Sequence, residues 1–95
     1  MKMNKEKFLK TELGGNMMEC VTAWDDALEL RYNNDYDSEE YARGMKTALW
    51  CQAQWEVYQM ALKQFYGMEY HFNRTDEYFG ICTADESDWL FKVER

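Results

Sequence analysis

The sequence predicts an α+β fold with two main helices, at about 17–32 and 38–66, and a small C-terminal antiparallel β-meander at about 68–94. Up to residue 66, apolar residues recur at intervals of three and four positions, the period of an amphipathic helix. After Gly67, apolar and polar residues alternate, the period of a strand with one buried face. A chain of 95 residues, 46% of them hydrophobic, is long enough for one core. We therefore expect a single domain over residues 1–95.

The first 15 residues are expected to be a basic N-terminal arm or a short helix, at about 3–12. Gly14 and Gly15 then predict a break, because glycine is common in turns and at helix ends. Asn16 is a suitable N-cap, and Glu19 three residues later completes a capping-box pattern. The helical part of the domain is accordingly expected to begin at residue 16.

The first main helix is amphipathic. Its apolar face contains Met17, Cys20, Val21, Trp24, Ala27 and Leu28, and its opposite, polar face contains Glu19, Thr22, Asp25, Asp26 and Glu29. Because the sequence pattern shows only one apolar face on this helix, we expect the polar face to lie in solvent and to be negative.

The second main helix follows an Asn/Asp-rich loop at 33–37, with Asp37 as the expected N-cap and Gly67 just past its end. A helix over 38–66 would be about 43 Å long, whereas a compact domain of this size is about 32 Å across. Either the helix bends, near Gly44, or it projects and meets a partner. Sixteen aromatic residues are also more than so small a core can easily hide, so some should be partly exposed.

The C-terminal part, 68–95, is expected to form three strands at about 68–73, 78–83 and 89–94, with turns between them. The main alternative is a helix that continues to Phe72 and leaves only a hairpin.

No catalytic or cofactor signature is present, and we expect a protein that is not an enzyme and has no cofactor and no metal. A calcium loop starting at Asp35 would need Gly at its sixth position and Glu at its twelfth, where the chain has Glu40 and Lys46. An enzyme that uses Cys82 and His71 on adjacent strands is a remote alternative.

Cys20, Cys51 and Cys82 are odd in number and isolated, so we expect reduced, buried cysteines and a cytoplasmic location, with a disulfide or shared metal site left open. No stretch has the length of apolar sequence that a membrane span needs, and no apolar signal region follows the N-terminal lysines.

The acidic residues are unevenly distributed. Nine of the 18 Asp and Glu residues lie between Glu12 and Glu40, where the only base is Arg31. A row of carboxylates on a helix can imitate a phosphate backbone and attract a basic cleft, and aromatic neighbours are typical of protein interfaces. The expected partner-binding residues are Glu19, Asp25, Asp26, Glu29, Tyr32, Asp35, Tyr36, Asp37, Glu39 and Glu40.

These features favour a small acidic interaction protein that binds a larger protein with a basic surface, without direct contact to nucleic acid or membrane. In its small size and acidity it is similar to phage-encoded anti-CRISPR and anti-restriction proteins. The narrower hypothesis is therefore inhibition of a nuclease or another nucleic-acid-binding protein by charge mimicry. The alternative is a self-associating accessory domain, a homodimer that uses the aromatic-rich helix at 38–66 as its interface.

Overall fold

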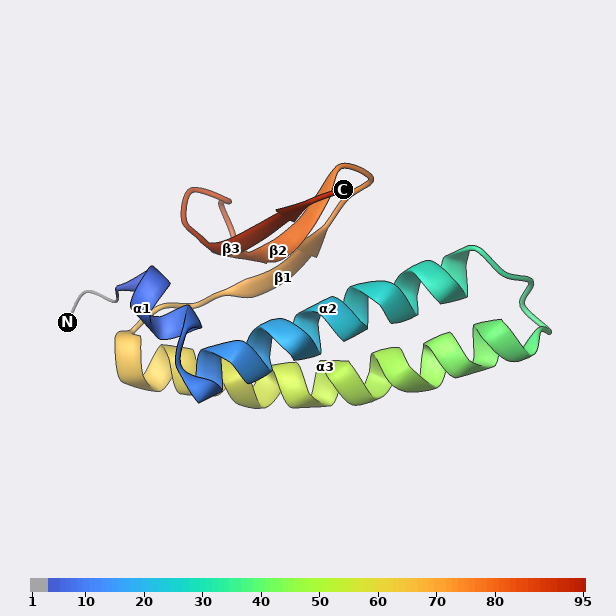
Figure 1. Cartoon of the computed structure of the whole chain (residues 1–95), viewed down its shortest axis with the longest axis horizontal. Helices are drawn as coiled ribbons and strands as arrows, with labels where there is room; N and C mark the ends of the chain where they lie inside the picture. Colours follow the sequence, from blue (N-terminus) through green and yellow to red (C-terminus); the bar gives the residue numbers. More distant parts are fainter. Residues whose placement is uncertain (1–3) are drawn as a thin grey trace.

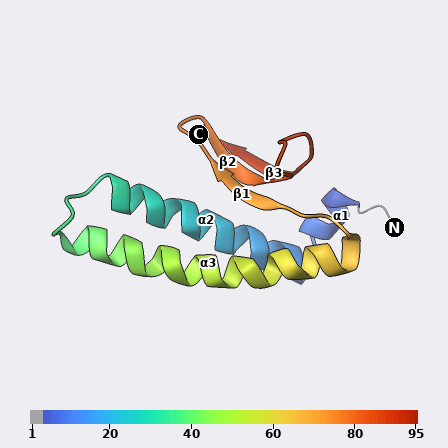
Figure 2. The same cartoon turned by 180° about the vertical axis from the view of Figure 1, so that it is seen from behind.

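The computed structural model describes residues 4–95, which form two long helices, one short helix and a three-stranded sheet. The elements are α1 (Lys5–Leu9), α2 (Glu12–Tyr32), α3 (Glu39–Tyr66), β1 (His71–Arg74), β2 (Tyr78–Cys82) and β3 (Trp89–Glu94). Helices α2 and α3 form a long antiparallel hairpin, and the sheet lies over α2 (Figure 1). Seen from behind, α2 still lies between the sheet and α3 (Figure 2). The α+β prediction is confirmed.

The start of α2 differs from the prediction. The chain breaks at Lys10 and Thr11, and Thr11 is the N-cap, because its side-chain oxygen accepts a hydrogen bond from the Gly14 amide at 3.1 Å. The predicted break at the glycine pair and the predicted cap at Asn16 are therefore wrong. Gly14 allows close packing instead, since a Cβ atom there would lie 2.1 Å from the Phe8 carbonyl oxygen.

Helix α3 begins and ends close to the predicted positions. Ser38, not Asp37, is the N-cap, and its hydroxyl oxygen accepts a hydrogen bond from the Tyr41 amide at 3.1 Å. At the other end Gly67 has a φ of 67°, the left-handed conformation that ends many helices, as predicted.

The hairpin projects and α3 runs on without a break through Gly44. A helix of this length spans about 42 Å, and the molecule is 48 Å long and 24 Å wide. Gly44 is a point at which α3 packs closely against α2: a Cβ atom there would lie 2.7 Å from the Ala27 carbonyl oxygen and 2.9 Å from the Arg31 nitrogen. Its role is close packing between the two helices, not bending.

The sheet is an antiparallel meander in the order β1-β2-β3, as predicted. Its first strand begins at His71 and not at Met68, because α3 ends at Tyr66 and the chain needs the next residues to cross to the sheet. In that crossing Tyr70 is buried, and its carbonyl oxygen accepts a hydrogen bond from the Gln59 side-chain amide at 2.6 Å. The alternative of a helix that continues to Phe72 is wrong.

The core lies where the sheet, α1, the first half of α2 and the second half of α3 meet. Its buried residues include Met17, Val21, Trp55, Leu62 and Ile81. Beyond this core, the half of the hairpin that contains the turn between α2 and α3 extends past the sheet (Figure 1).

Candidate protein-binding surface at the hairpin tip

The connection between α2 and α3, residues 33–38, forms the far end of the hairpin (Figure 1). The Asn34 side-chain amide donates a hydrogen bond to the Leu30 carbonyl oxygen at 2.6 Å. The Ser38 hydroxyl donates to the Asp35 carbonyl oxygen at 2.6 Å. Because these side chains satisfy backbone groups that the helix ends leave free, the connection has a defined conformation.

Two tyrosines stand out from this end of the molecule. The exposed fraction is 63% for Tyr32 and 83% for Tyr36. The Tyr36 ring contacts Tyr41 with a centroid separation of 5.1 Å. The Arg31 guanidinium lies 5.5 Å from the Tyr32 centroid and 5.6 Å from that of Tyr41. The rings are thus held by neighbours on one side and remain open to solvent on the other.

Four carboxylates lie close to the tyrosines in the chain. Asp35, Asp37, Glu39 and Glu40 are all exposed, and within residues 4–95 none of them forms an ion pair. The sequence from 32 to 42 has no Lys or Arg. We call Tyr32, Tyr36 and these four acids the acidic tip. Two guanidinium groups, of Arg31 and Arg74, lie 5.5 Å from the Tyr32 centroid, on the side of the tip nearest the body of the molecule. The four carboxylates make the rest of the tip negative, which would attract a basic surface.

Asp25 and Glu29 do not belong to this surface. Asp25 is 2% exposed and lies beneath the sheet. The Arg95 guanidinium donates to its carboxylate at 2.6 and 2.9 Å, and the Arg74 Nε donates to it at 3.0 Å. Arg74 also pairs with Glu29 at 2.5 Å. The prediction that the polar face of this helix lies in solvent is wrong at Asp25, because α2 is covered by α3 on one side and by the sheet on the other.

The protonation of Asp25 follows from these contacts. Burial by itself would raise the pKa of the carboxyl, but the hydrogen bonds from Arg95 and Arg74 favour the charged form and hold the pKa below its usual value. Asp25 is therefore a charged residue that fastens β1 and the end of β3 to α2.

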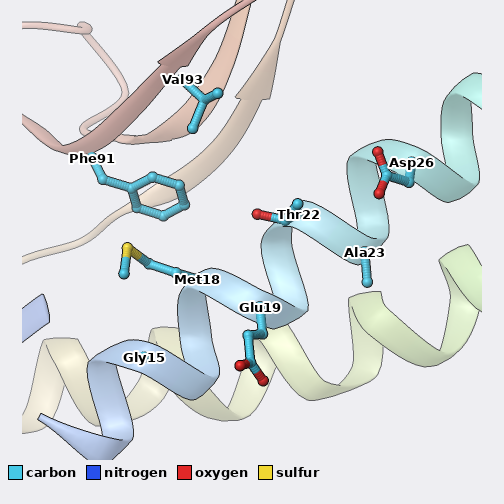
Figure 3. A pocket seen from close by; sticks show the side chains of 8 residues that line it. All are labelled: Gly15, Met18, Glu19, Thr22, Ala23, Asp26, Phe91 and Val93. Carbon is cyan, nitrogen blue, oxygen red and sulfur yellow. The ribbon is translucent and has the colours of Figure 1, made fainter. Parts of the chain in front are cut away.

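Glu19 and Asp26 lie on a third part of the surface. Both are exposed and line a groove between α2 and β3, together with Phe91 and Val93 (Figure 3). The ten predicted binding residues thus fall into three groups: six form the acidic tip, two line this groove, and Asp25 and Glu29 hold the sheet to the helix.

Sequence reasoning missed Arg74 and Arg95 as partners of Asp25, and Phe91 and Val93 as walls of the groove. These pairings join residues that are far apart in the chain; Arg95 and Asp25, for example, are separated by 70 positions. No local spacing signals such a contact, and an isolated aspartate on a helix has the same sequence pattern whether it is buried or exposed.

The cysteines and the histidine provide no assembled catalytic group among the described residues. His71 and Cys82 are cross-strand partners, as the remote enzyme alternative requires. However, the side chain of His71 contacts the Gln59 amide at 3.4 Å, and that of Cys82 contacts the Asn73 amide at 3.9 Å. Burial raises the pKa of Cys82, which opposes a thiolate nucleophile. All three cysteines are free and buried.

Within residues 4–95 no group of three or more His, Cys, Asp or Glu side chains is placed to hold a metal ion. None of the helices in that range combines the length and the apolar character that crossing a membrane requires. No protein-family model, curated protein or solved structure matches the chain.

Proposed function

We propose that this protein binds a basic surface of a larger protein through the acidic tip. The observation that carries the proposal is a set of four exposed carboxylates near two exposed tyrosines, at the end of a hairpin that extends past the sheet. None of the four forms an ion pair with another residue of the range 4–95. Protein interfaces are enriched in tyrosine at their centres and in polar groups at their rims. A projecting tip can also enter a cleft that the broader sheet end of the molecule cannot.

The narrower form of the proposal concerns the partner. A cleft that binds nucleic acid is lined by Lys and Arg side chains that normally meet phosphates. Carboxylates carried on a narrow hairpin meet the same cations, and occupation of the cleft excludes the nucleic acid. The protein would then inhibit a nuclease or another nucleic-acid-binding protein by charge mimicry.

A charge-neutral variant of the tip tests the proposal. The variant combines Asp35→Asn, Asp37→Asn, Glu39→Gln and Glu40→Gln and is immobilised beside the natural protein in a lysate of the source cell. Proteins that bind through the tip should be captured by the natural protein and lost from the variant. Added salt should release them, because exposed charges are screened within about 10 Å at 0.1 M salt.

A matched control separates the tip from overall charge. The changes Glu12→Gln, Glu56→Gln, Asp76→Asn and Glu77→Gln remove four exposed acids from other parts of the molecule. This control variant should still capture the partner. Equal capture by both variants, or capture that salt does not weaken, would overturn the proposal.

Self-association is a second candidate function, favoured by the outer face of α3. Leu49, Trp50, Val57 and Met60 are each more than 60% exposed. Trp50 and Val57 are seven residues apart and Met60 follows three residues later, so these three lie along one side of the helix. An exposed apolar stripe of this kind is typical of helices that pair with another copy.

Sedimentation equilibrium distinguishes this candidate from the first. A homodimer formed through α3 should dissociate in the variant Trp50→Glu/Val57→Glu, whereas the tip variant should remain dimeric. A monomer at all concentrations up to tens of micromolar would remove this candidate and leave the first unaffected.

A further inference from the structure

A groove of about 590 Å³ runs between one flank of α2 and the strand β3 (Figure 3). Its walls are mostly apolar. The Phe91 and Val93 side chains extend from β3 toward α2, and Met18 points toward Phe91 from the helix (Figure 3). Gly15 and Ala23 widen the groove because they have little or no side chain. Three polar side chains, Glu19, Thr22 and Asp26, complete the lining.

The strand beside the groove is an edge of the sheet. β3 is the last strand in the order β1-β2-β3 and pairs only with β2 among the described elements. The Arg95 amide donates to the Glu77 carbonyl oxygen, so these opposed residues form a hydrogen-bonded pair. Hydrogen-bonded and non-hydrogen-bonded pairs alternate along an antiparallel ladder. In the register Phe79↔Val93 and Gly80↔Lys92, the backbone groups of Lys92 and Glu94 therefore face the open edge.

An extended chain can add to this edge. A fourth strand would lie about 4.8 Å beyond β3, above the flank of α2 that is left uncovered by the present sheet. Alternate side chains of the added strand would point down toward α2, into the apolar groove. At the other edge strand, β1, the side chains that face α2 are already engaged: Phe72 stacks on Trp24 at 4.2 Å, and Arg74 pairs with Asp25.

The charges on the groove define what kind of chain fits. Glu19 and Asp26 are exposed on the helix flank, and no Lys or Arg within residues 4–95 pairs with either of them. They are seven residues apart, which is about 10 Å along a helix. Side chains on one face of an extended chain are about 7 Å apart at a spacing of two residues and about 13 Å apart at a spacing of four, so two long basic side chains of one peptide can reach both carboxylates.

From the edge, the groove and these charges we infer that the α2–β3 groove binds an extended peptide by strand addition. The peptide pairs with the backbone of β3 at Lys92 and Glu94 and places an apolar side chain against Phe91 and Met18. Its Lys or Arg side chains meet Glu19 and Asp26. This site is separate from the acidic tip and does not depend on it.

The test starts from a random-peptide library displayed on phage and selected on the full chain. The expected result is enrichment of peptides in which basic and apolar residues occupy alternate positions of the same face, in the order basic-x-apolar-x-basic, so that both kinds of side chain face α2. One enriched peptide is then synthesised, labelled and titrated by fluorescence anisotropy, with a second version that is N-methylated at alternate residues. Because N-methylation removes backbone donors and keeps the side chains, it should abolish binding if the peptide adds as a strand.

Two pairs of protein variants test where on the protein the peptide binds. Glu19→Lys/Asp26→Lys should weaken binding about tenfold or more, whereas Glu12→Lys/Glu56→Lys, which changes net charge equally, should not. Lys92→Pro removes an edge donor without interrupting the ladder to β2 and should abolish binding. Lys92→Ala keeps that donor and should bind normally. Circular dichroism checks that each variant is folded.

Several outcomes would overturn the inference. These are an absence of enriched peptides, equal binding of the N-methylated peptide, and unchanged binding by Lys92→Pro in a folded protein. A dimer of the natural protein that Lys92→Pro dissociates would assign the edge to a second copy of the chain. Failure of the tip experiment, with equal capture by both variants, would leave the α2–β3 groove unaffected. The two proposals can therefore be disproved independently.

Discussion

The Arg95 guanidinium lies over Asp25 with two hydrogen bonds, Nη2 to Oδ1 at 2.6 Å and Nη1 to Oδ2 at 2.9 Å. This bidentate pair joins the residue after β3 to the middle of α2. Arg74 at the end of β1 donates to the same carboxylate, so one buried acid anchors both outer strands. Charged hydrogen bonds of this geometry are among the strongest in proteins, and their loss leaves two cations without their main partner.

We predict that Asp25→Ala lowers the free energy of unfolding by about 2–4 kcal/mol. The value should lie toward the lower part of that range if Glu29, which also contacts both arginines, compensates in part. Chemical denaturation followed by circular dichroism measures the change. The control is Asp26→Ala at the adjacent exposed position, for which we expect a change within about 0.5 kcal/mol. Equal losses in the two variants would show that the Asp25 network contributes little.

Asp25 should also make the stability of the protein depend on pH. The pKa of Asp25 is lowered in the folded protein, so the folded state binds this proton less tightly than the unfolded chain. Its contribution is complete above the ordinary Asp pKa of about 3.9 and is lost as the pH falls through the lower, folded value. We expect the free energy of unfolding of the natural protein to fall more steeply below pH 4 than that of Asp25→Asn. Denaturation curves at a series of pH values test this, and parallel slopes would contradict it.

A third prediction concerns the contact between the two long helices. In Gly44→Ala the new Cβ atom would meet the backbone of α2 at Ala27 and Arg31 at under 3 Å, so the helices must separate. We expect a loss of about 1–3 kcal/mol of stability, the range of overpacked substitutions.

Gly15→Ala is the matched control for this prediction. Gly15 is also inside a helix, but nothing lies within 4 Å of a Cβ atom there. Alanine should therefore stabilise the protein by up to about 1 kcal/mol, because it favours the helix. Thermal or chemical unfolding measures the change in stability of each variant, and we expect the two changes to have opposite signs. A stabilised Gly44→Ala variant would show that the helices do not meet closely at this point.

Local patterns predicted the fold well and the candidate site only in part. Gly67 and the alternation that follows it act through neighbouring residues, so the end of α3 and the order of the strands could be predicted. The N-cap of α3 was placed one residue too early, at Asp37 instead of Ser38. The exposed position of the acidic tip could be predicted for the same reason, since all its residues lie between positions 32 and 40 of the chain. Asp25 could not be placed, because its burial depends on Arg74 and Arg95, and the spacing of charges in a sequence does not show which helix face a distant strand will cover.

The prediction of a helix break at the glycine pair was wrong for a related reason. Gly14 and Gly15 have low helix propensity, and a local rule places a break there. In the structure Gly14 lies within α2 because Phe8 packs against it so closely that no side chain fits. Tertiary packing thus required a glycine at a position where local propensity alone favours a turn, and Thr11, three residues earlier, supplied the cap.

The last prediction concerns the cysteines. Cys20 and Cys51 are buried between the two long helices, and the Cys20 thiol donates to the Cys51 carbonyl oxygen at 3.4 Å. Burial, with a smaller contribution from Cys51, raises the pKa of Cys20 to about 11. At pH 8 only about one Cys20 in a thousand would then be the reactive thiolate.

We expect a thiol reagent such as iodoacetamide to label the folded protein very slowly and all three cysteines rapidly in urea, as measured by mass spectrometry. An exposed cysteine introduced by Ala53→Cys should react at once in the folded protein. Rapid labelling of Cys20 without denaturant would mean that the two helices separate readily at this contact.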